Sequence, residues 1–187
     1  MTDAAQAGGA DGAGQVQRRL VLLRHAKSAY PHGVPDHERP LAGKGRRNAY
    51  ATGEWFVREG PRPDRVVCSD AVRARHTWEI IAGCLAEVGP AAEVVLEPRV
   101  YGADPGDLVQ LARDTPEAVH TLVVVGHEPT LSLTTLQLAG PGSDPTALAR
   151  VAAKFVTNGI AVLRLTGPWA GLAAGQAVLE LFAAPRA

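Results

Sequence analysis

The feature that most constrains the fold of this chain is a regular alternation of short apolar runs with longer segments of helical character. The runs lie at Leu20 to Leu23, Arg65 to Cys68, Glu93 to Leu96 and Leu122 to Val125. A continuous apolar run is expected of a strand that is buried on both faces, as strands are in a parallel sheet. The alternation therefore predicts an α/β fold with a mostly parallel central sheet and helices on both faces.

Helical segments fill the intervals between these runs, and cap residues indicate where they begin. The predicted helices are Gly43 to Arg58, Ser69 or Asp70 to about Val88, Pro105 to Arg113, Pro129 to Gly140, and one capped by Asp144-Pro145. Two late β-type runs, Ile160 to Leu165 and Ala177 to Phe182, are separated by Gly-rich sequence and predict a hairpin. The expected architecture is a three-layer sandwich with a C-terminal antiparallel hairpin.

The length of 187 residues suits one compact domain. Residues 1–17 contain hardly any large side chain and cannot offset their own ordering entropy, so we expect a disordered N-terminal tail. A single domain is then expected over residues 18–187.

Composition excludes several classes of protein. With 19 basic and 19 acidic side chains, the chain does not resemble a nucleic-acid binder or a polybasic membrane-surface protein. No apolar run approaches the ~20 residues of a membrane span, and the N-terminus does not read as a secretory signal. The two cysteines, Cys68 and Cys84, lie in apolar stretches, which predicts a buried reduced pair and a cytoplasmic location.

Candidate functional residues follow three of the predicted strands directly. Arg24 and His25 end the first run, Arg73 comes shortly after the second, and His127 follows the last after Gly126. In open α/β sheets, ligands bind beyond the carboxyl ends of the strands, so we expect these side chains to meet at one edge.

This set of residue types indicates an anion site that contains an imidazole. Arginine offers planar donors that match phosphate, and Arg73 falls in a first helical turn, where free N–H groups favour anions. Each residue alone also has a structural interpretation: Arg73 could pair with Glu79, and His127 could be a hydrogen-bonded loop residue. The joint occurrence at strand ends favours the functional interpretation, with phosphate as the commonest ligand.

Four sequence segments, RHAKS, RPLAGKG, CSDAVRARHTWE and VVVGHEPTLS, occur in the order typical of the histidine phosphatase superfamily. Between Leu20 and Leu165 the chain resembles the SixA-type phosphohistidine phosphatase branch of that superfamily. The resemblance implies that His25 is phosphorylated during turnover, that Arg24 and Arg73 are pocket arginines, and that His127 is the second pocket histidine. It implies no metal and no other cofactor.

Phosphoryl transfer needs positioning and electrostatic stabilisation, which these residue types supply. We expect neutral His25 to attack phosphorus through one ring nitrogen while a backbone carbonyl holds the other N–H. Arg24, Arg73 and a protonated His127 would surround the equatorial oxygens, and water would then hydrolyse the phosphohistidine.

The general acid is less clearly indicated. Glu97, after the third strand, is one candidate, and Asp36 and Glu38, in the loop before Arg39, are others. Ser28 is a candidate hydrogen-bond donor to the phosphate, or a residue that caps its turn. A phosphohistidine substrate would need less acid assistance, because imidazole is a better leaving group than an alkoxide.

Compactness favours a protein phosphohistidine as substrate, since little inserted sequence is available to build a lid over a small molecule. A small phosphomonoester, such as a sugar phosphate or nucleotide, is the alternative substrate. A phosphate-binding module without turnover is a further alternative, disfavoured because binding alone needs no nucleophile at a strand end. The expected partner is a phosphohistidine-containing protein or a small phosphorylated molecule, and neither nucleic acid nor a membrane is expected.

Overall fold

The computed structural model describes residues 17–187 and contains a six-stranded sheet of order β3-β2-β4-β1-β5-β6. The strands are β1 (Arg19–Arg24), β2 (Arg65–Cys68), β3 (Glu93–Leu96), β4 (Thr121–Gly126), β5 (Ile160–Leu165) and β6 (Ala177–Ala183). The first four strands pair in parallel, and β5 runs antiparallel to β1 and β6. The predicted α/β class and the C-terminal antiparallel hairpin are confirmed.

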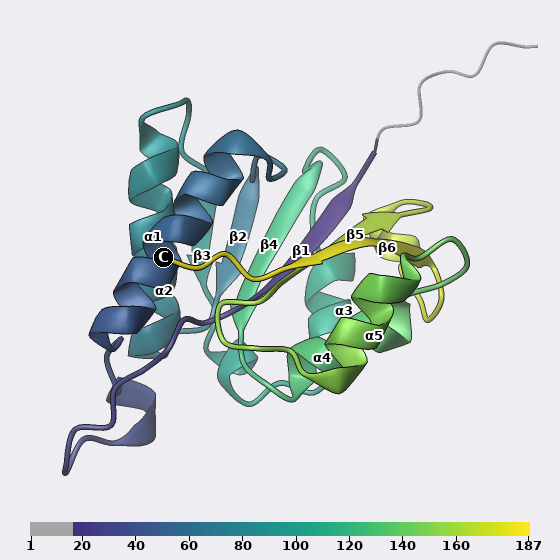
Figure 1. The fold of residues 1–187 in the computed structure, drawn as a ribbon. Coiled ribbons are helices and arrows are strands. Elements are labelled where there is room, and N and C mark those ends of the chain that lie inside the picture. Colours follow the sequence, from purple (N-terminus) through teal and green to yellow (C-terminus); the bar gives the residue numbers. More distant parts are fainter. Residues whose placement is uncertain (1–16) are drawn as a thin grey trace, which may run out of the picture.

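Helices cover both faces of the sheet and make the predicted three layers (Figure 1). The helices are α1 (Gly43–Arg58), α2 (Val72–Ala86), α3 (Pro105–Arg113), α4 (Thr130–Leu138) and α5 (Pro145–Ala153), with short 3-10 turns η1 (Asp36–Glu38), η2 (Pro98–Tyr101) and η3 (Trp169–Gly171). Helices α1 and α2 pack together on one face, and α3, α4 and α5 lie on the other.

The buried strands divide their side chains between two apolar cores, because successive residues of a strand point to opposite faces. In β1, Val21 and Leu23 join the core beneath α1 and α2, whereas Leu20 and Leu22 join the core beneath α3 to α5. Strand β4 is buried along its whole length. Strands β1 and β4 therefore hold in place the segments that follow their carboxyl ends, which begin at His25 and His127.

The start of α2 differs from the sequence prediction. Ala71 occupies the N-cap position and makes no side-chain hydrogen bond, so the expected cap by Ser69 or Asp70 is wrong. The hydroxyl of Ser69 accepts from the backbone N–H of Ala71 at 3.3 Å and lies 2.8 Å from Nε2 of His127. Two other predicted helix starts agree more closely with the structure. The Asp144 side chain caps α5 by accepting from the N–H of Ala147, and Pro129 is the N-cap of α4.

Both cysteines are free thiols, but only Cys68 is buried, so the prediction of a buried pair is wrong for Cys84. Cys84 lies on α2, where its thiol is partly exposed. Of the predicted tail, residues 1–16 lie outside the described residues. Within residues 17–187, no helix is both long and apolar enough to span a membrane.

Candidate active site

The carboxyl ends of β1, β2 and β4 lie level with one another. Arg24 is paired in register with Gly126, and Leu23 and Cys68 both pair with Val125. The segments that leave these strands therefore start from one edge of the sheet, as the sequence predicts. They bring together His25, Arg24, Arg73 and His127, which we call the His25 cluster.

The His25 ring is held from both sides. Its Nδ1–H donates to the carbonyl of Ala26 at 2.8 Å, and its Nε2 accepts from Arg73 Nε at 3.3 Å. These contacts assign the tautomer: the proton is on Nδ1, and Nε2 carries the lone pair, which accepts from Arg73 in this arrangement. Burial, together with the charges of Arg73 and Arg24, lowers the pKa of His25 to about 4, so the ring is neutral at pH 7. The residue keeps 8% of its surface exposed.

Arg73 reaches the cluster from the first turn of α2 and is itself buried. Besides its contact with His25, it donates through Nη1 to the backbone carbonyl of Asp36 at 2.6 Å. Its Nη2 donates to the Asp36 carboxylate at 2.9 Å. The same guanidinium that contacts the His25 ring thus already binds a carboxylate oxygen through Nη2, so this donor accepts an anionic oxygen.

His127 lies opposite His25, with the two ring centres 5.1 Å apart. Its Nε2 is 2.8 Å from the Ser69 hydroxyl. Burial, followed by the neighbouring His25 and Arg73, lowers the pKa of His127 to about 3, while Asp36 acts in the opposite direction. The ring is therefore neutral at pH 7 in this arrangement. The protonated His127 expected around a bound phosphoryl group stays a prediction, because the negative charge of that group would raise the pKa of the ring.

Arg24 is fixed by a hydrogen bond from its Nη1 to the carbonyl of Phe155 at 2.6 Å. Burial lowers its pKa, while nearby Glu128 acts in the opposite direction. Two buried nitrogens of the cluster, Arg24 Nε and His127 Nδ1, have no hydrogen-bond partner within residues 17–187. Buried polar atoms are normally satisfied, so these two favour a polar ligand.

Asp36, predicted as a candidate acid, does lie at the site, but as a carboxylate. It accepts from the hydroxyl of Tyr101 at 2.7 Å and from Arg73, and it forms an ion pair with Arg39. The Tyr101 hydrogen bond, followed by Arg39 and Arg73, lowers the pKa of Asp36 to about 2. A carboxyl group with that pKa carries no proton to donate at neutral pH.

Glu97 is not brought to the cluster. Its carboxylate accepts from the backbone and the guanidinium of Arg99, and these bonds lower its pKa. Ser28 is buried, and its hydroxyl accepts a hydrogen bond from Arg39. Glu38 is exposed at the end of η1. Within residues 17–187, none of these three side chains forms a hydrogen bond with the His25 ring, whose partners are Ala26 and Arg73.

Sequence reasoning missed two residues at the site, Tyr101 and Ser69. The Tyr101 ring lies 5.4 Å from that of His127 and hydrogen-bonds Asp36, so it closes the side of the cluster nearest η2. Both residues follow the carboxyl end of a strand, β3 for Tyr101 and β2 for Ser69. The same strand-end rule that identified His25 could have identified them.

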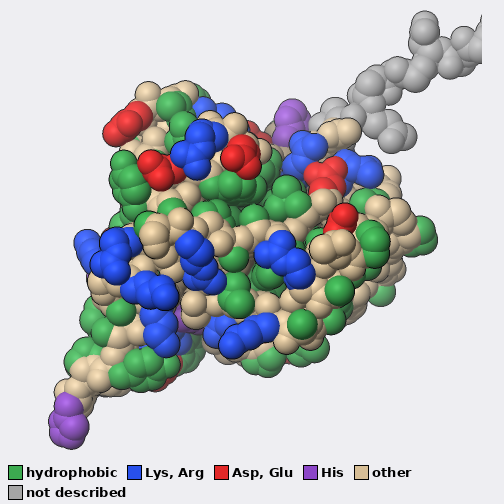
Figure 2. All heavy atoms as spheres, viewed as in Figure 1, with side chains coloured by type: hydrophobic (Ala, Val, Ile, Leu, Met, Phe, Trp, Pro, Cys, Tyr) green, Lys and Arg blue, Asp and Glu red, His purple; other side chains and the backbone are tan. Residues whose placement is uncertain are grey.

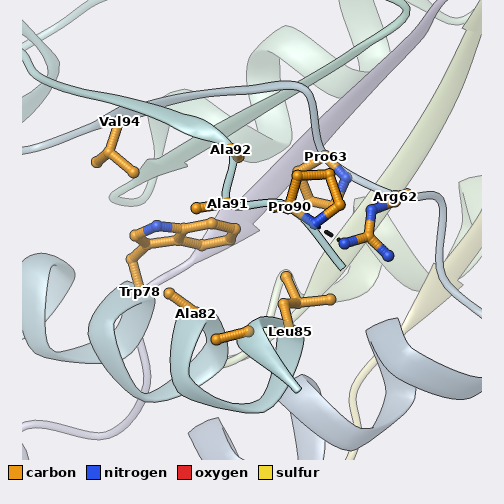
Figure 3. Close-up of a pocket in the computed structure, with 10 residues that line it drawn as sticks. Arg62, Pro63, Trp78, Ala82, Leu85, Pro90, Ala91, Ala92 and Val94 are labelled. Carbon is orange, nitrogen blue, oxygen red and sulfur yellow. Dashed lines mark hydrogen bonds between the residues drawn. The ribbon is translucent and has the colours of Figure 1, made fainter. Parts of the chain in front are cut away.

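A separate hollow of about 70 Å³ lies between α2 and the segment leading into β3 (Figure 3). Its walls are mostly apolar, with Trp78 and Leu85 of α2 facing Pro63 and Pro90. The one charged lining residue, Arg62, donates to the carbonyls of Val88 and Pro90. Within residues 17–187, no three His, Cys, Asp or Glu side chains are grouped to hold a metal ion. The His25 cluster is thus the better candidate for chemistry.

Comparison with known proteins identifies the family. The model of the histidine phosphatase superfamily, branch 1, matches residues 20–123. The chain belongs to this superfamily. It is 45% identical over 165 residues to an uncharacterized protein of Mycobacterium tuberculosis, covering 88% of this chain and all of the relative. It is 27% identical over 139 residues to the phosphohistidine phosphatase SixA of Escherichia coli, covering 74% and 84% of the two chains.

Solved structures agree with this assignment to the superfamily. A SixA-type protein from Nakamurella multipartitia superposes with a TM-score of 0.80 at 35% identity, over 95% of this chain and 100% of that chain. The predicted resemblance to the SixA-type branch is therefore confirmed. Membership in the superfamily supports a phosphatase activity for this chain.

Proposed function

We propose that the protein is a phosphatase in which His25 carries the phosphoryl group during turnover, with protein phosphohistidine as its substrate. The observation that carries the proposal is the fixed His25 tautomer, with Nδ1–H on the Ala26 carbonyl and Nε2 beside Arg73. A neutral ring with a directed lone pair is what nucleophilic attack on phosphorus requires.

In the first step, the Arg73 Nε–H turns from His25 Nε2 to a phosphoryl oxygen. The Nε2 lone pair then attacks phosphorus, and the bond from phosphorus to the substrate's ring nitrogen breaks. The electron pair returns to the leaving ring, which departs as neutral imidazole when its other nitrogen carries a proton. In the second step, water attacks phosphorus and the bond from phosphorus to His25 Nε2 breaks, with its electron pair returning to Nε2. Inorganic phosphate leaves, and the water proton passes to solvent. Arg24 and Arg73 offset the charge on the equatorial oxygens in both steps.

The substrate's phosphoryl group takes the place of the Asp36 carboxylate on Arg73. Arginine binds phosphate and carboxylate through the same fork geometry, so one anion can replace the other. The Nε of Arg24 and the Nδ1 of His127, which are buried without partners among residues 17–187, would then gain phosphoryl oxygens or water as partners.

We choose phosphohistidine as the substrate because neither candidate general acid, Glu97 or Asp36, carries a proton to give to a leaving group. The carboxyl groups of Glu97 and Asp36 both have lowered pKa values, so neither supplies a proton at neutral pH. An alkoxide leaving group needs such a proton, whereas a protonated phosphohistidine ring does not. The name of the Escherichia coli relative supports the same substrate. We also propose a cytoplasmic location, because both cysteines are free thiols.

The test is a substrate panel with His25→Ala as the blank. It compares a phosphohistidine peptide, p-nitrophenyl phosphate, sugar phosphates and nucleotides by their kcat/KM values. We expect the highest value for the phosphohistidine peptide and no turnover above background for His25→Ala. A preference for a sugar phosphate would overturn the substrate, and wild-type rates in His25→Ala would overturn the nucleophile.

A further inference from the structure

All three lysines of the chain lie around one hollow. The chain uses Lys only at positions 27, 44 and 154, and its other basic side chains are arginines. A hollow of about 570 Å³ is lined by all three lysines and by two arginines. Its lining includes Arg24, Lys27, Lys44, Lys154, Thr157 and Arg186, and we call it the lysine pocket. None of its lining residues is Asp or Glu.

The lysine pocket adjoins the His25 cluster through Arg24, which belongs to both. The segment that carries Lys154 is tied to this wall, because Arg24 Nη1 donates to the carbonyl of Phe155. The backbone N–H of Asn158, in the same segment, donates to the carbonyl of His25 at 3.2 Å. A molecule bound in the pocket would therefore lie next to the proposed phosphoryl site.

The backbone walls of the pocket are closely packed. A Cβ at Gly45 would lie 2.0 Å from the carbonyl oxygen of Lys27, so glycine allows the first turn of α1 to pack directly on Lys27. The C-terminal segment is held to Asn158, whose Nδ2 donates to the carbonyl of Pro185 at 3.0 Å. Four separate segments of the chain are thus fixed around the hollow, and each contributes a cation.

The cationic side chains themselves are solvated. Lys27, Lys44, Lys154 and Arg186 are exposed, and within the described part of the chain none of them forms an ion pair. Figure 2 shows Lys and Arg side chains gathered across the middle of this face, with most of the Asp and Glu side chains above them. Because the net charge of the chain is zero, this concentration is a local feature.

We propose that the lysine pocket binds acidic side chains that flank the phosphorylated residue of a protein substrate. The inference rests on the proposed phosphatase function and adds a specificity determinant to it. Exposed lysines on flexible stems are compact point charges that suit carboxylates of an approaching protein surface. A small bisphosphate would instead favour buried, preorganised donors, and a nucleic acid would favour net positive charge over a larger surface.

The first experiment measures binding without catalysis. An amine-acetylating reagent reacts with lysines and the N-terminal amine, so mass spectrometry of residues 27, 44 and 154 reports on this pocket alone. The probe is an unphosphorylated peptide of eight aspartates around a central histidine, and its control carries asparagines instead. We expect the aspartate peptide, and not the asparagine peptide, to slow acetylation of all three lysines. Equal protection by both peptides, or protection by a short single-stranded oligonucleotide alone, would overturn the proposal.

The second experiment measures specificity with the same two peptides phosphorylated on histidine. We expect wild type to prefer the acidic peptide in kcat/KM by about tenfold at low salt, on the scale of several exposed ion pairs. In Lys44→Gln/Lys154→Gln this preference should fall towards one, through a rise in KM for the acidic peptide. The charge-retaining Lys44→Arg/Lys154→Arg should keep it. Arg62→Gln/Arg65→Gln, at and before the start of β2 and outside the pocket lining, controls for net charge and should also keep it.

These experiments separate this inference from the proposed function. Protection of the lysines without hydrolysis of either peptide would support the pocket and overturn the phosphatase activity. Equal hydrolysis of both peptides without protection would overturn the pocket and leave the phosphatase standing. A preference that persists in Lys44→Gln/Lys154→Gln would also overturn the pocket.

Discussion

The His25 cluster and the lysine pocket both carry positive charge, and the side chain of Arg24 belongs to each. In the cluster, His25 and Arg73 are buried, and each is hydrogen-bonded to defined partners. In the pocket, the lysines are exposed and form no ion pair within residues 17–187. The difference suits two tasks at one edge of the sheet. Catalysis needs donors that are fixed in position, whereas recognition of a substrate can use solvated, flexible side chains.

The largest expected effect comes from removing a fixed donor. Arg73→Gln should lower kcat by about 10²- to 10³-fold, as loss of one preorganised donor to a developing oxyanion does. Arg73→Lys retains the charge but loses the fork that joins His25 to Asp36, so it should recover only part of the activity. Steady-state kinetics with the phosphohistidine peptide measure both variants. If Arg73→Gln lost no more activity than a pocket lysine variant, the contrast between the two regions would be wrong.

The histidines of the His25 cluster should also have lower pKa values than a solvent-exposed histidine. Because the pKa values of His25 and His127 are lowered to about 4 and 3, both rings should stay neutral down to about pH 5. Heteronuclear NMR of the two rings tests this and reports the Nδ1–H tautomer of His25. In Arg73→Gln the His25 pKa should rise, because a nearby positive charge is removed. An apparent pKa near 6.5 for His25 in wild type would contradict the burial argument.

The same shifts predict a pH-dependent stability. In the unfolded chain both rings regain a pKa of about 6.5, so unfolding takes up protons below that pH. The stability that these depressed pKa values contribute is therefore present above pH 6.5 and is lost as pH falls towards 4. Thermal melts of wild type between pH 7 and pH 5 should show a falling Tm. A His25→Gln/His127→Gln variant should lose less over the same interval, and an equal loss would assign the effect to other groups.

A smaller effect is expected from removing the Asp36 carboxylate, which is hydrogen-bonded to Arg73. Asp36→Asn should lower the inhibition constant of inorganic phosphate by about two- to fivefold, because an exposed ion pair of that strength no longer competes. Glu38→Gln removes a carboxylate from the same 3-10 turn without any contact to Arg73, and it serves as the control. Equal inhibition constants in Asp36→Asn and wild type would show that Asp36 does not compete with phosphate.

The smallest effect is expected at Glu97. Its carboxylate is paired with Arg99 and has a lowered pKa, so Glu97→Gln should change kcat/KM for the phosphohistidine peptide by less than about twofold. A general acid would cost about 10²- to 10⁴-fold on removal. A loss in that range would restore Glu97 as the acid and require the loop after β3 to move.

The sequence predicts the strands and the strand-end residues well, because both follow from local patterns. The buried runs of β1 and β4 are continuous, and the position of His25 follows from where β1 ends. What local patterns cannot give is contact between distant segments. The Ser69 hydroxyl contacts His127, and Asp36 pairs with Arg73 and Tyr101, only because tertiary packing brings them together. The lowered pKa of His127 has the same origin, since the burial of the ring is a property of the assembled site.

The central claim is that His25 carries the phosphoryl group through its Nε2. The most direct measurement is to mix the protein with a phosphohistidine peptide, quench rapidly at alkaline pH, and locate the phosphate by mass spectrometry and ³¹P NMR. The account predicts an acid-labile phosphate on His25 Nε2 that forms and decays during turnover and is absent in His25→Ala. Turnover at the wild-type rate with no phosphorylated protein, or with phosphate on His127 instead, would contradict it.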